Sequence, residues 1–560
     1  MSSPKRILLS GVFGPFGVDD DFGRRENVME LFHNQVTRAQ GVASFRHHHR
    51  SFGLYFLAEN VDAEVTVLDF PSRERFEAEV AKGYDLVGIS FIAPNFVKAR
   101  EMASITRRVA PGATIVLGGH GAAIEGVEAL IDCDHVVRGE GIRWLRSFLG
   151  QDPDAPIRHP ALPSAERASI FGVPLPNASA NLLVPGVGCV NGCSFCSTSH
   201  FFGKAYTPFL STGQEIFDTA CRLADERGTD EFFVMDENFL KDTARARALL
   251  ALVERHARPF RFSIFSSAEA IAAFGVDSMV RLGVDFVWIG VEAGGSEGNF
   301  EKNEGLDARA LVRSLRERGI VVLASGILCQ EHHTPDNMQR DIDFMTDLQA
   351  DFVQFMLLTP LPVTALYRSQ KARGLLRDDL PWEEWHGQKE LSYRHPAFPG
   401  DAPQRWIDAA FRQDYERNGS SMLRVAETAF RGWCHLSSLP RDPLIAARLA
   451  SSEERARLWA CMMPTVARFA VNAQERARAQ ALDAGVRRAL PPSARERAYR
   501  LGAQALAARW ALRIRMFGDM IQPRSLLTRY PAGRAGVVSR EREERSEEAA
   551  GHVELAAARV

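Results

Sequence analysis

The sequence has few cysteines and no long apolar run. Its 560 residues include only 8 cysteines, which is too sparse for a disulfide scaffold. No apolar stretch approaches the roughly 20 residues that a membrane-spanning helix needs. The first residues also lack the apolar core of a signal peptide. We therefore expect a cytoplasmic protein without a transmembrane segment.

An excess of charge of one sign is also lacking. The net charge is −2, so nothing electrostatic favours binding to nucleic acid. Apolar residues make up 46% of the chain and charged residues 25%, as in an ordinary globular protein. Because a single core stops growing near ~250 to 300 residues, a chain of this length predicts several domains.

Three of the cysteines stand close together, in the pattern C-x3-C-x2-C. They are Cys189, Cys193 and Cys196, with a turn-forming Asn191-Gly192 pair between the first two. A [4Fe-4S] cluster normally takes four cysteine ligands, so three would leave one iron open to another molecule. Two alternatives remain at this point: a structural zinc site with His200 as fourth ligand, and a chance group of core cysteines.

Residues 1–150 alternate short β-branched runs with helical patterns. The expected strands lie at 5–12, 63–70, 84–92, 114–120 and 135–141. Such alternation predicts an α/β domain with a doubly wound parallel sheet, flavodoxin-like or Rossmann-like. Ligands of these sheets bind at the carboxyl ends of the strands. Small residues lie at those ends, and we single out Gly14, Ser90, Gly118, Gly119, Gly139 and Glu140.

Residues 19–50 form an insertion in this pattern, with three consecutive histidines, His47 to His49. Adjacent side chains point in different directions, which disfavours a metal site. We therefore favour a solvated polar loop. His33 and Asn34 could instead face a cofactor. After this domain, the proline-rich segment 151–181 predicts an extended linker.

Residues 182–373 repeat strand and helix six times. The first strand leads into the cysteine loop, and further strands are expected at 230–238, 261–269, 285–294, 321–329 and 351–362. Six units predict a partial (β/α)6 barrel, with chemistry at the carboxyl ends of the strands. Residues 374–530 predict a helical region, and 531–560 a disordered tail. The aromatic segment 381–396 predicts either a pocket lining or a satellite core.

The cysteine motif, with an aromatic residue before its last cysteine, resembles the signature of the radical S-adenosylmethionine (SAM) superfamily. In that family SAM chelates the open iron and is cleaved to a 5'-deoxyadenosyl radical. The resemblance implies SAM contacts at the cysteine loop and at strand ends, namely Phe195, Asp236, Glu237, Ser266, Glu292 and Ser325.

The glycine-edged sheet ahead of that motif resembles the cobalamin-binding domain of cobalamin-dependent radical SAM enzymes. By this resemblance, the six residues named at its strand ends would contact cobalamin. The wider cobalamin-binding family supplies a histidine to cobalt from a D-x-H-x-x-G motif after the first strand. Here that loop reads FGPFGVDDDFGRR and has no histidine. We therefore expect cobalamin without a lower axial histidine; the alternative is a degenerate domain that binds nothing.

The resemblance implies a cobalamin-dependent radical SAM enzyme that methylates an unactivated carbon of a small-molecule or lipid substrate. A flavodoxin or ferredoxin would supply the electron. Two rival hypotheses stay open: a cyclase or rearrangement enzyme that uses the same cofactors, and a zinc-stabilised binding protein.

Overall fold

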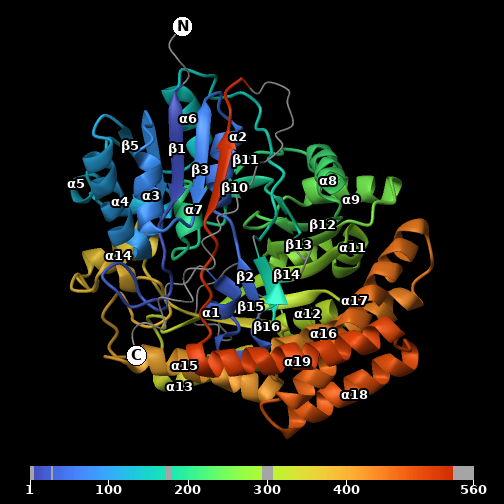
Figure 1. Ribbon diagram of the computed structural model, residues 1–560. Helices are drawn as coiled ribbons and strands as arrows, with labels where there is room; N and C mark the ends of the chain where they lie inside the picture. The colour runs from blue at the N-terminus through green and yellow to red at the C-terminus, as the bar shows by residue number, and fades with distance from the viewer. Residues whose placement is uncertain are drawn as a thin grey trace.

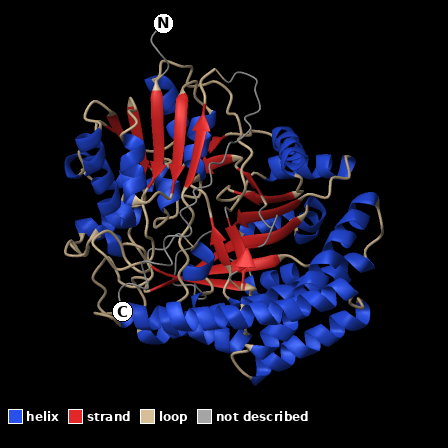
Figure 2. Cartoon of the chain, viewed as in Figure 1, coloured by secondary structure: helices blue, strands red, loops and turns tan. Residues whose placement is uncertain are grey.

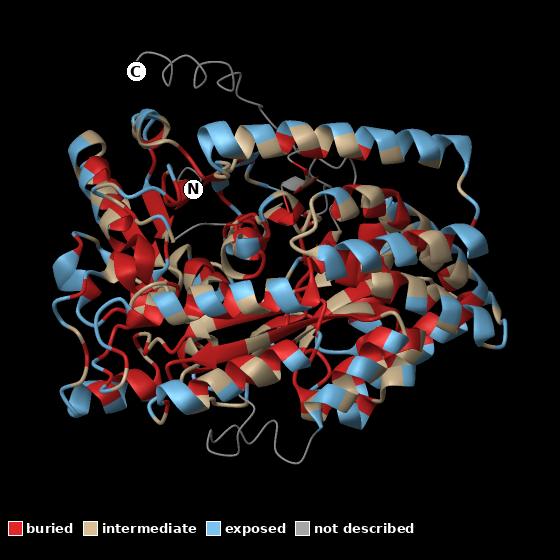
Figure 3. Cartoon of the chain, turned by 90° about the horizontal axis from the view of Figure 1, so that it is seen from below, coloured by how far each residue is buried: buried red, intermediate tan, exposed pale blue. Residues whose placement is uncertain are grey.

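The computed structural model describes residues 5–26, 30–165, 167–171, 173–174, 180–292 and 307–533. Figure 1 shows two parallel sheets side by side, with long helices below them. The strands of both sheets stand out in Figure 2. Seen from below (Figure 3), these strands are buried, and the helices around them expose their outer faces. None of the described helices is long and apolar enough to cross a membrane.

The N-terminal sheet has five parallel strands in the flavodoxin-like order 2-1-3-4-5. This confirms the doubly wound fold. Its strands are β1 (Arg6–Gly11), β3 (Glu64–Asp69), β4 (Leu86–Ser90), β5 (Thr114–Gly118) and β6 (His135–Val136). The order across the sheet is β3-β1-β4-β5-β6.

Both faces of this sheet are covered because alternate side chains point to opposite sides. Ile7 and Leu9 of β1 share a core with α2 (Phe52–Glu59) and α6 (Gly141–Phe148). Leu8 shares a core with α3 (Arg73–Val80) and α4 (Phe96–Val109). The remaining short helices are η2 (Ala93–Asn95), η3 (His120–Ala123) and α5 (Val127–Leu130).

A sixth strand, β17 (Leu526–Tyr530), pairs antiparallel with β3 at the edge of the N-terminal sheet. In Figure 1 it is the red arrow beside the blue strands. We expected only helices between 374 and 530, so this prediction is wrong for Leu526–Tyr530. Its five residues carry no alternation that distinguishes them from a loop, and their partner strand lies more than 450 residues away.

The second sheet is the expected partial (β/α)6 barrel of six parallel strands, which we call the half barrel below. In spatial order these are β9 (Asn181–Leu183), β12 (Glu231–Val234), β13 (Arg261–Ser266), β14 (Val284–Glu292), β15 (Val321–Leu328) and β16 (Phe352–Leu357). The helices that pack outside it are α8 (Gly213–Arg227), α9 (Thr243–Arg255), α10 (Ala268–Phe274), α11 (Val276–Leu282), α12 (Ala308–Glu317), α13 (Pro335–Asp347) and α14 (Ala365–Ala372).

The cysteine loop follows β9, as predicted. It is enclosed by a hairpin of β10 (Gly186–Gly188) and β11 (Tyr206–Pro208), and it leads into α7 (Ser197–Phe201). Gly188 lies at φ +90°, and a Cβ there would stand 2.2 Å from the carbonyl oxygen of Ala205. Only glycine therefore allows the hairpin to close this tightly at the start of the cysteine motif.

The insertion forms real structure against the half barrel. It comprises α1 (Leu31–Gln35), η1 (Arg38–Ala43) and β2 (Arg46–His48), and β2 pairs with β7 (Arg167–Ile170), which pairs with β8 (Val173–Pro174). The solvated polar loop expected at His47 to His49 is therefore wrong. Strand alternation explains the error: one face of β2 pairs with the buried Glu30 through Arg46 and His48, and the other meets aromatic rings.

The C-terminal region is a helical layer, as predicted. It contains α15 (Ala402–Asn418), α16 (Ser421–Ser438), α17 (Pro443–Arg468), α18 (Ala473–Ala489) and α19 (Ala494–Phe517). The aromatic segment before it, 381–396, includes η5 (Trp382–Glu384) and packs Trp385 into a satellite core with Tyr367, Leu376 and Leu380, while Tyr393 joins the barrel core. The tail expected to be disordered, beyond residue 533, lies outside the described residues.

Candidate cofactor and active site

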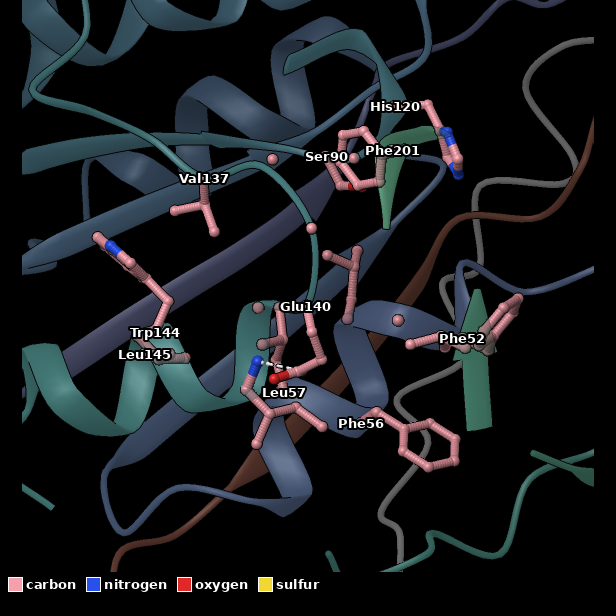
Figure 4. A pocket seen from close by; sticks show the side chains of 18 of the residues that line it. Phe52, Phe56, Leu57, Ser90, His120, Val137, Glu140, Trp144, Leu145 and Phe201 are labelled. Atoms are coloured by element: carbon pink, nitrogen blue, oxygen red, sulfur yellow. Dashed lines mark hydrogen bonds between the residues drawn. The ribbon is translucent and has the colours of Figure 1, made fainter. Parts of the chain in front are cut away.

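A large cavity lies between the carboxyl end of the N-terminal sheet and the cysteine loop. Its volume is about 280 Å³. Five of the six small residues predicted at the strand ends line it: Ser90, Gly118, Gly119, Gly139 and Glu140. Ser90 and Glu140 are labelled in Figure 4. The walls also include residues that the sequence analysis missed, such as Phe52, Phe56, Leu57, Val137, Trp144 and Leu145.

Gly118 and Gly119 show why this edge is glycine-rich. A Cβ on Gly118 would meet nothing within 4 Å, so its missing side chain leaves open space on the cavity side. Gly119 has φ +78°, and a Cβ there would stand 2.6 Å from the carbonyl oxygen of Phe91. The first glycine makes room for a ligand, and the second allows the chain to turn away.

Glu140 caps the helix at the cavity wall. Its carboxylate accepts hydrogen bonds from the backbone N–H groups of Ile142 (2.5 Å) and Arg143 (3.0 Å). This is the dashed contact in Figure 4. Glu140 therefore fixes the start of α6, which carries Trp144 and Leu145 into the wall. Its role is to position the wall.

Three residues of the N-terminal domain that the sequence singled out, Gly14, His33 and Asn34, lie elsewhere. Gly14 is not part of the cavity lining; its N–H bonds the carbonyl oxygen of Pro71 at 2.9 Å. Its loop is held by Gln522, whose amide bonds Phe16. His33 and Asn34, the alternative cofactor-facing pair, line a different, polar cavity beside α15.

Residues on either side of the cysteine loop line the same cavity: Gly188 of β10, and Thr198, Phe201 and Phe202 of α7 and its end. His120, from the N-terminal domain, packs against the Phe201 ring with the centroids 4.6 Å apart. Burial lowers the pKa of His120 to about 4, so this ring is neutral. The two domains therefore meet through aromatic packing at the cavity. The helix that follows the cysteine loop shares this cavity with Gly118, Gly119 and Gly139, which we call the glycine edge.

The three cysteines form no disulfide and are half-buried. Burial raises the pKa of Cys196 to about 11, and the charges of Glu237, Cys193 and Cys189 add to this rise. The same causes raise the pKa of Cys189. The three thiols would need a positive group to stabilise them as thiolates, and three cysteine sulfurs are the donor type that an iron–sulfur cluster takes. Among the described residues, no group of three His, Cys, Asp or Glu side chains is arranged to hold a metal ion.

His200 and Ser199 shape the cysteine loop from α7. Burial lowers the pKa of His200, which the backbone of Cys193 raises in part, and the buried Nε2 atom of its ring has no hydrogen-bond partner among the described residues. The Ser199 hydroxyl donates to the carbonyl oxygen of Cys189 at 2.7 Å and accepts from the N–H of Gly192 at 3.1 Å. These bonds hold the turn between the first two cysteines.

Glu237 borders the cavity close to the cysteine thiols. Its side chain is solvent-accessible, and the protein packed around its carboxyl group, together with the nearby Asp236 carboxylate, raises the pKa of Glu237 to about 7. The Thr198 hydroxyl donates to it. Of the predicted carboxylates, Glu237 is the one that reaches both the cysteine loop and the cavity.

Asp236 has a different task. Its carboxylate accepts bonds of 2.8 Å from both the Tyr206 hydroxyl and the Arg245 guanidinium, and one of 3.1 Å from the N–H of Asn238. Tyr206 lies on β11 and Arg245 on α9, so this buried network ties the cysteine hairpin to the barrel. The contact of Tyr206 with Arg245 could not be predicted, because each is a single residue outside any motif.

The remaining predicted residues lie at neighbouring strand ends. Ser266 donates to the Asn238 side chain at 3.2 Å, and this amide also bonds Ser267, which joins the ends of β12 and β13. Glu292 is buried, with φ +69°, at a register shift between β14 and β15. Ser325 is half-buried on β15. Phe195 packs against the barrel core.

Comparisons with known proteins agree with this division. Residues 40–148 match the B12 binding domain family, and residues 183–345 match the Radical SAM superfamily. The chain is 22% identical over 367 residues to an uncharacterized methyltransferase of Pyrococcus horikoshii, which covers 58% of this chain and 79% of that protein. It is 24% identical over 343 residues to the bacteriochlorophyllide d C-12(1)-methyltransferase of Chlorobaculum tepidum, with coverage of 58% and 74%.

A solved structure shares the fold. The radical S-adenosylmethionine methyltransferase TsrM from Kitasatospora setae, with cobalamin and a [4Fe-4S] cluster bound, aligns with a TM-score of 0.51 and 18% sequence identity. The alignment covers 81% of this chain and all of that one.

Proposed function

The chain combines a B12-binding domain with a radical SAM domain, and from that premise we propose that it is a cobalamin-dependent methyltransferase. The observation that carries this proposal is the shared cavity, whose walls include Gly118 and Gly119 of the N-terminal domain and Thr198 and Phe201 of α7, the helix that directly follows the cysteine loop. One space bordered by both cofactor-binding edges is what methyl transfer between the two domains requires.

The residues fit the groups in question. Cys189, Cys193 and Cys196 would hold the cluster, and the glycine edge with its apolar walls would hold cobalamin. Glu237 and Glu292 are the candidates for the polar groups of SAM. When bound, the cluster supplies an electron to SAM and cobalamin carries a methyl group.

The side chains of this protein orient those groups and exclude water. The aromatic contact of His120 with Phe201 seals one side of the cavity without introducing a charge. The Asp236, Tyr206 and Arg245 network holds the cysteine hairpin at a fixed distance from the barrel strands. A site fixed in this way avoids reorganisation during the reaction.

The finer features of the function belong to the same proposal. We expect the acceptor to be a small molecule, methylated at a carbon without an activating group. We also expect the electron to come from a flavodoxin or ferredoxin in the cytoplasm.

Anaerobic incubation with dithionite, hydroxocobalamin and methyl-labelled SAM tests the proposal. We expect 5'-deoxyadenosine to form, and we expect label to move from SAM into an acceptor supplied as a cell extract. Cys221→Ser, which alters a cysteine outside the motif, is the matched control and should behave like the wild type. Cleavage of SAM without transfer of label would favour the cyclase alternative, and no cleavage would contradict the proposal.

A further inference from the structure

The inner face of the half barrel carries aromatic side chains, and the insertion covers only part of this face. On β15 and β16, Val321, Leu323 and Phe352 are between 0% and 4% exposed, packed beneath Phe32 of α1. On β12, β13 and β14, Phe233, Phe265 and Trp288 remain half-buried. The same inner face is therefore sealed over one half and accessible over the other.

The accessible half is a continuous stack of rings. The Phe265 and Trp288 rings lie parallel with centroids 5.1 Å apart, and the Phe233 ring meets Phe265 edge-on at 5.7 Å. Phe265 and Trp288 are also direct partners in the register of β13 and β14. Flat, partly exposed rings of this kind favour a flat ligand, because stacked and edge-on contacts act between unsaturated faces.

Two imidazoles, from His47 of β2 and from His49 directly after β2, face this aromatic stack. His47 and His49 share one side of the strand, with their centroids 6.0 Å apart, and the His49 ring stacks on Phe233 at 5.7 Å. Both remain half-buried. Burial lowers the pKa of His47 to about 3 and lowers that of His49, so both rings are neutral.

The tautomer of His49 is fixed by its backbone contact. Its Nδ1 lies 2.8 Å from the carbonyl oxygen of Ser164, and a carbonyl can only accept, so Nδ1 carries the proton. The other nitrogen of the neutral ring, Nε2, is therefore a hydrogen-bond acceptor.

The stack adjoins the cofactor cavity. Phe233 and Met235 are two residues apart at the end of β12, so they point to the same side, and Met235 lines the cavity. In Figure 1, β2 lies beside β14 and β15, on the side of the barrel nearest the N-terminal sheet.

Resting on the proposed function, we infer that Phe233, Phe265 and Trp288, together with His47 and His49, form the seat of the methyl acceptor. The seat selects a flat, uncharged, unsaturated molecule that carries an O–H or N–H donor for His49 Nε2. An aliphatic chain would lose the ring contacts, and a molecule without a donor would make no hydrogen bond to His49 Nε2.

A binding experiment with two flat probes tests this seat without any cofactor. The probes are 7-hydroxycoumarin, which has an O–H donor, and 7-methoxycoumarin, which does not; their fluorescence anisotropy reports binding to the full chain at pH 6.5. We expect the hydroxyl compound to bind about fivefold more tightly, the value of one net hydrogen bond. His49→Phe keeps a stacking ring and removes the acceptor, so it should abolish this difference.

Two further variants and one control complete the test. Phe233→Leu and Trp288→Leu should weaken binding of both probes, while His256→Phe, an exposed histidine that packs on Phe217 outside the barrel, should change neither. Equal binding of the two probes by the wild type would overturn the inference. So would no binding of either probe, or displacement of both by palmitate at lower concentration.

The outcome is separable from that of the proposed function. The probe measurement uses protein without cluster, SAM or cobalamin, so failure of the cofactor chemistry leaves it unaffected. If SAM cleavage and cobalamin binding are normal but the coumarins do not bind, the proposed function stands and the seat is wrong.

Discussion

The two parallel sheets present opposite chemistry at their carboxyl ends. The N-terminal sheet ends in small residues, Gly118, Gly119 and Gly139, which expose backbone and leave space. The half barrel ends in Asp236, Glu237 and Glu292, which place charge near the cysteine loop. Because both edges border the same region, one can admit a large flat ligand while the other holds a polar, charged one.

The cysteine ligands should give the largest effect on the barrel side of this comparison. Cys196→Ser removes one of three thiolates, and we expect loss of the cluster absorbance and a fall in 5'-deoxyadenosine by more than about 100-fold. Even the partners of metal ligands cost about 10- to 100-fold when they are lost. Iron and sulfide analysis checks the first effect and chromatography the second. Cobalamin binding should persist; its loss would mean that the two edges are not independent.

A large side chain at the glycine edge should weaken cobalamin binding by the N-terminal domain. Gly118→Leu fits the backbone, since its Cβ meets nothing within 4 Å, but it fills the cavity. We expect cobalamin affinity to fall about 100-fold or more, equivalent to about 2.7 kcal/mol of overpacking. Titration followed by visible absorption measures it.

Gly112→Leu is the matched control, because Gly112 is exposed and its Cβ would also meet nothing within 4 Å. It should bind cobalamin like the wild type, and both variants should retain the cluster. Unchanged cobalamin affinity in Gly118→Leu would place the cobalamin site elsewhere.

The pH dependence of stability tests the role of Asp69, which holds the start of α2 at the cavity wall. It is fully buried, and it accepts hydrogen bonds from the Ser51 N–H at 2.8 Å and the Ser51 hydroxyl at 2.7 Å at the start of α2, whose Phe52 and Phe56 line the cavity. Burial raises the pKa of Asp69 to about 6.

A folded-state pKa above the unfolded value stabilises the protein at low pH, and this contribution is lost as the pH rises through about 6. Two pKa units correspond to about 3 kcal/mol. The free energy of unfolding of the wild type, minus that of Asp69→Asn, should therefore fall between pH 4 and pH 7. Urea denaturation followed by circular dichroism measures both proteins, and parallel pH profiles would contradict the assignment.

Tyr206 should give the smallest effect, on the carboxylate side. Tyr206→Phe removes the hydroxyl that donates to Asp236 and accepts from Arg245, but leaves the ion pair of 2.8 Å between those two residues. We expect the free energy of unfolding to fall by about 1 kcal/mol. Tyr499→Phe, at an exposed position of α19, is the control and should change it little. A loss as large as that of Arg245→Ala would show that the ion pair depends on the hydroxyl.

The two edges were predictable from the sequence for different reasons. Strand alternation and the spacing of Cys189, Cys193 and Cys196 are local patterns, so both sheets and the cysteine loop were foreseen. The glycines at Gly118 and Gly119 follow directly from a strand, so their place at a sheet edge was also foreseen. These features depend on residues close together in the chain.

The contacts between distant segments were not predictable in this way. The pairing of β17 with β3, the cover that α1 and β2 give the half barrel, and the link from Tyr206 to Arg245 each join residues far apart in the chain. The histidines of β2 were assigned to solvent because three polar residues in a row carry no sign of the aromatic rings that surround them. Burial by a remote element leaves no local pattern.

The magnetic interaction between the two cofactors is the most direct test of the shared cavity. Electron paramagnetic resonance of the anaerobic protein, loaded with cob(II)alamin and a reduced cluster, reports whether the two metal centres are near each other. We predict that the cobalt signal of the wild type relaxes faster than that of Cys196→Ser, which lacks the cluster. Equal relaxation in the two proteins would contradict a single cavity that faces both edges.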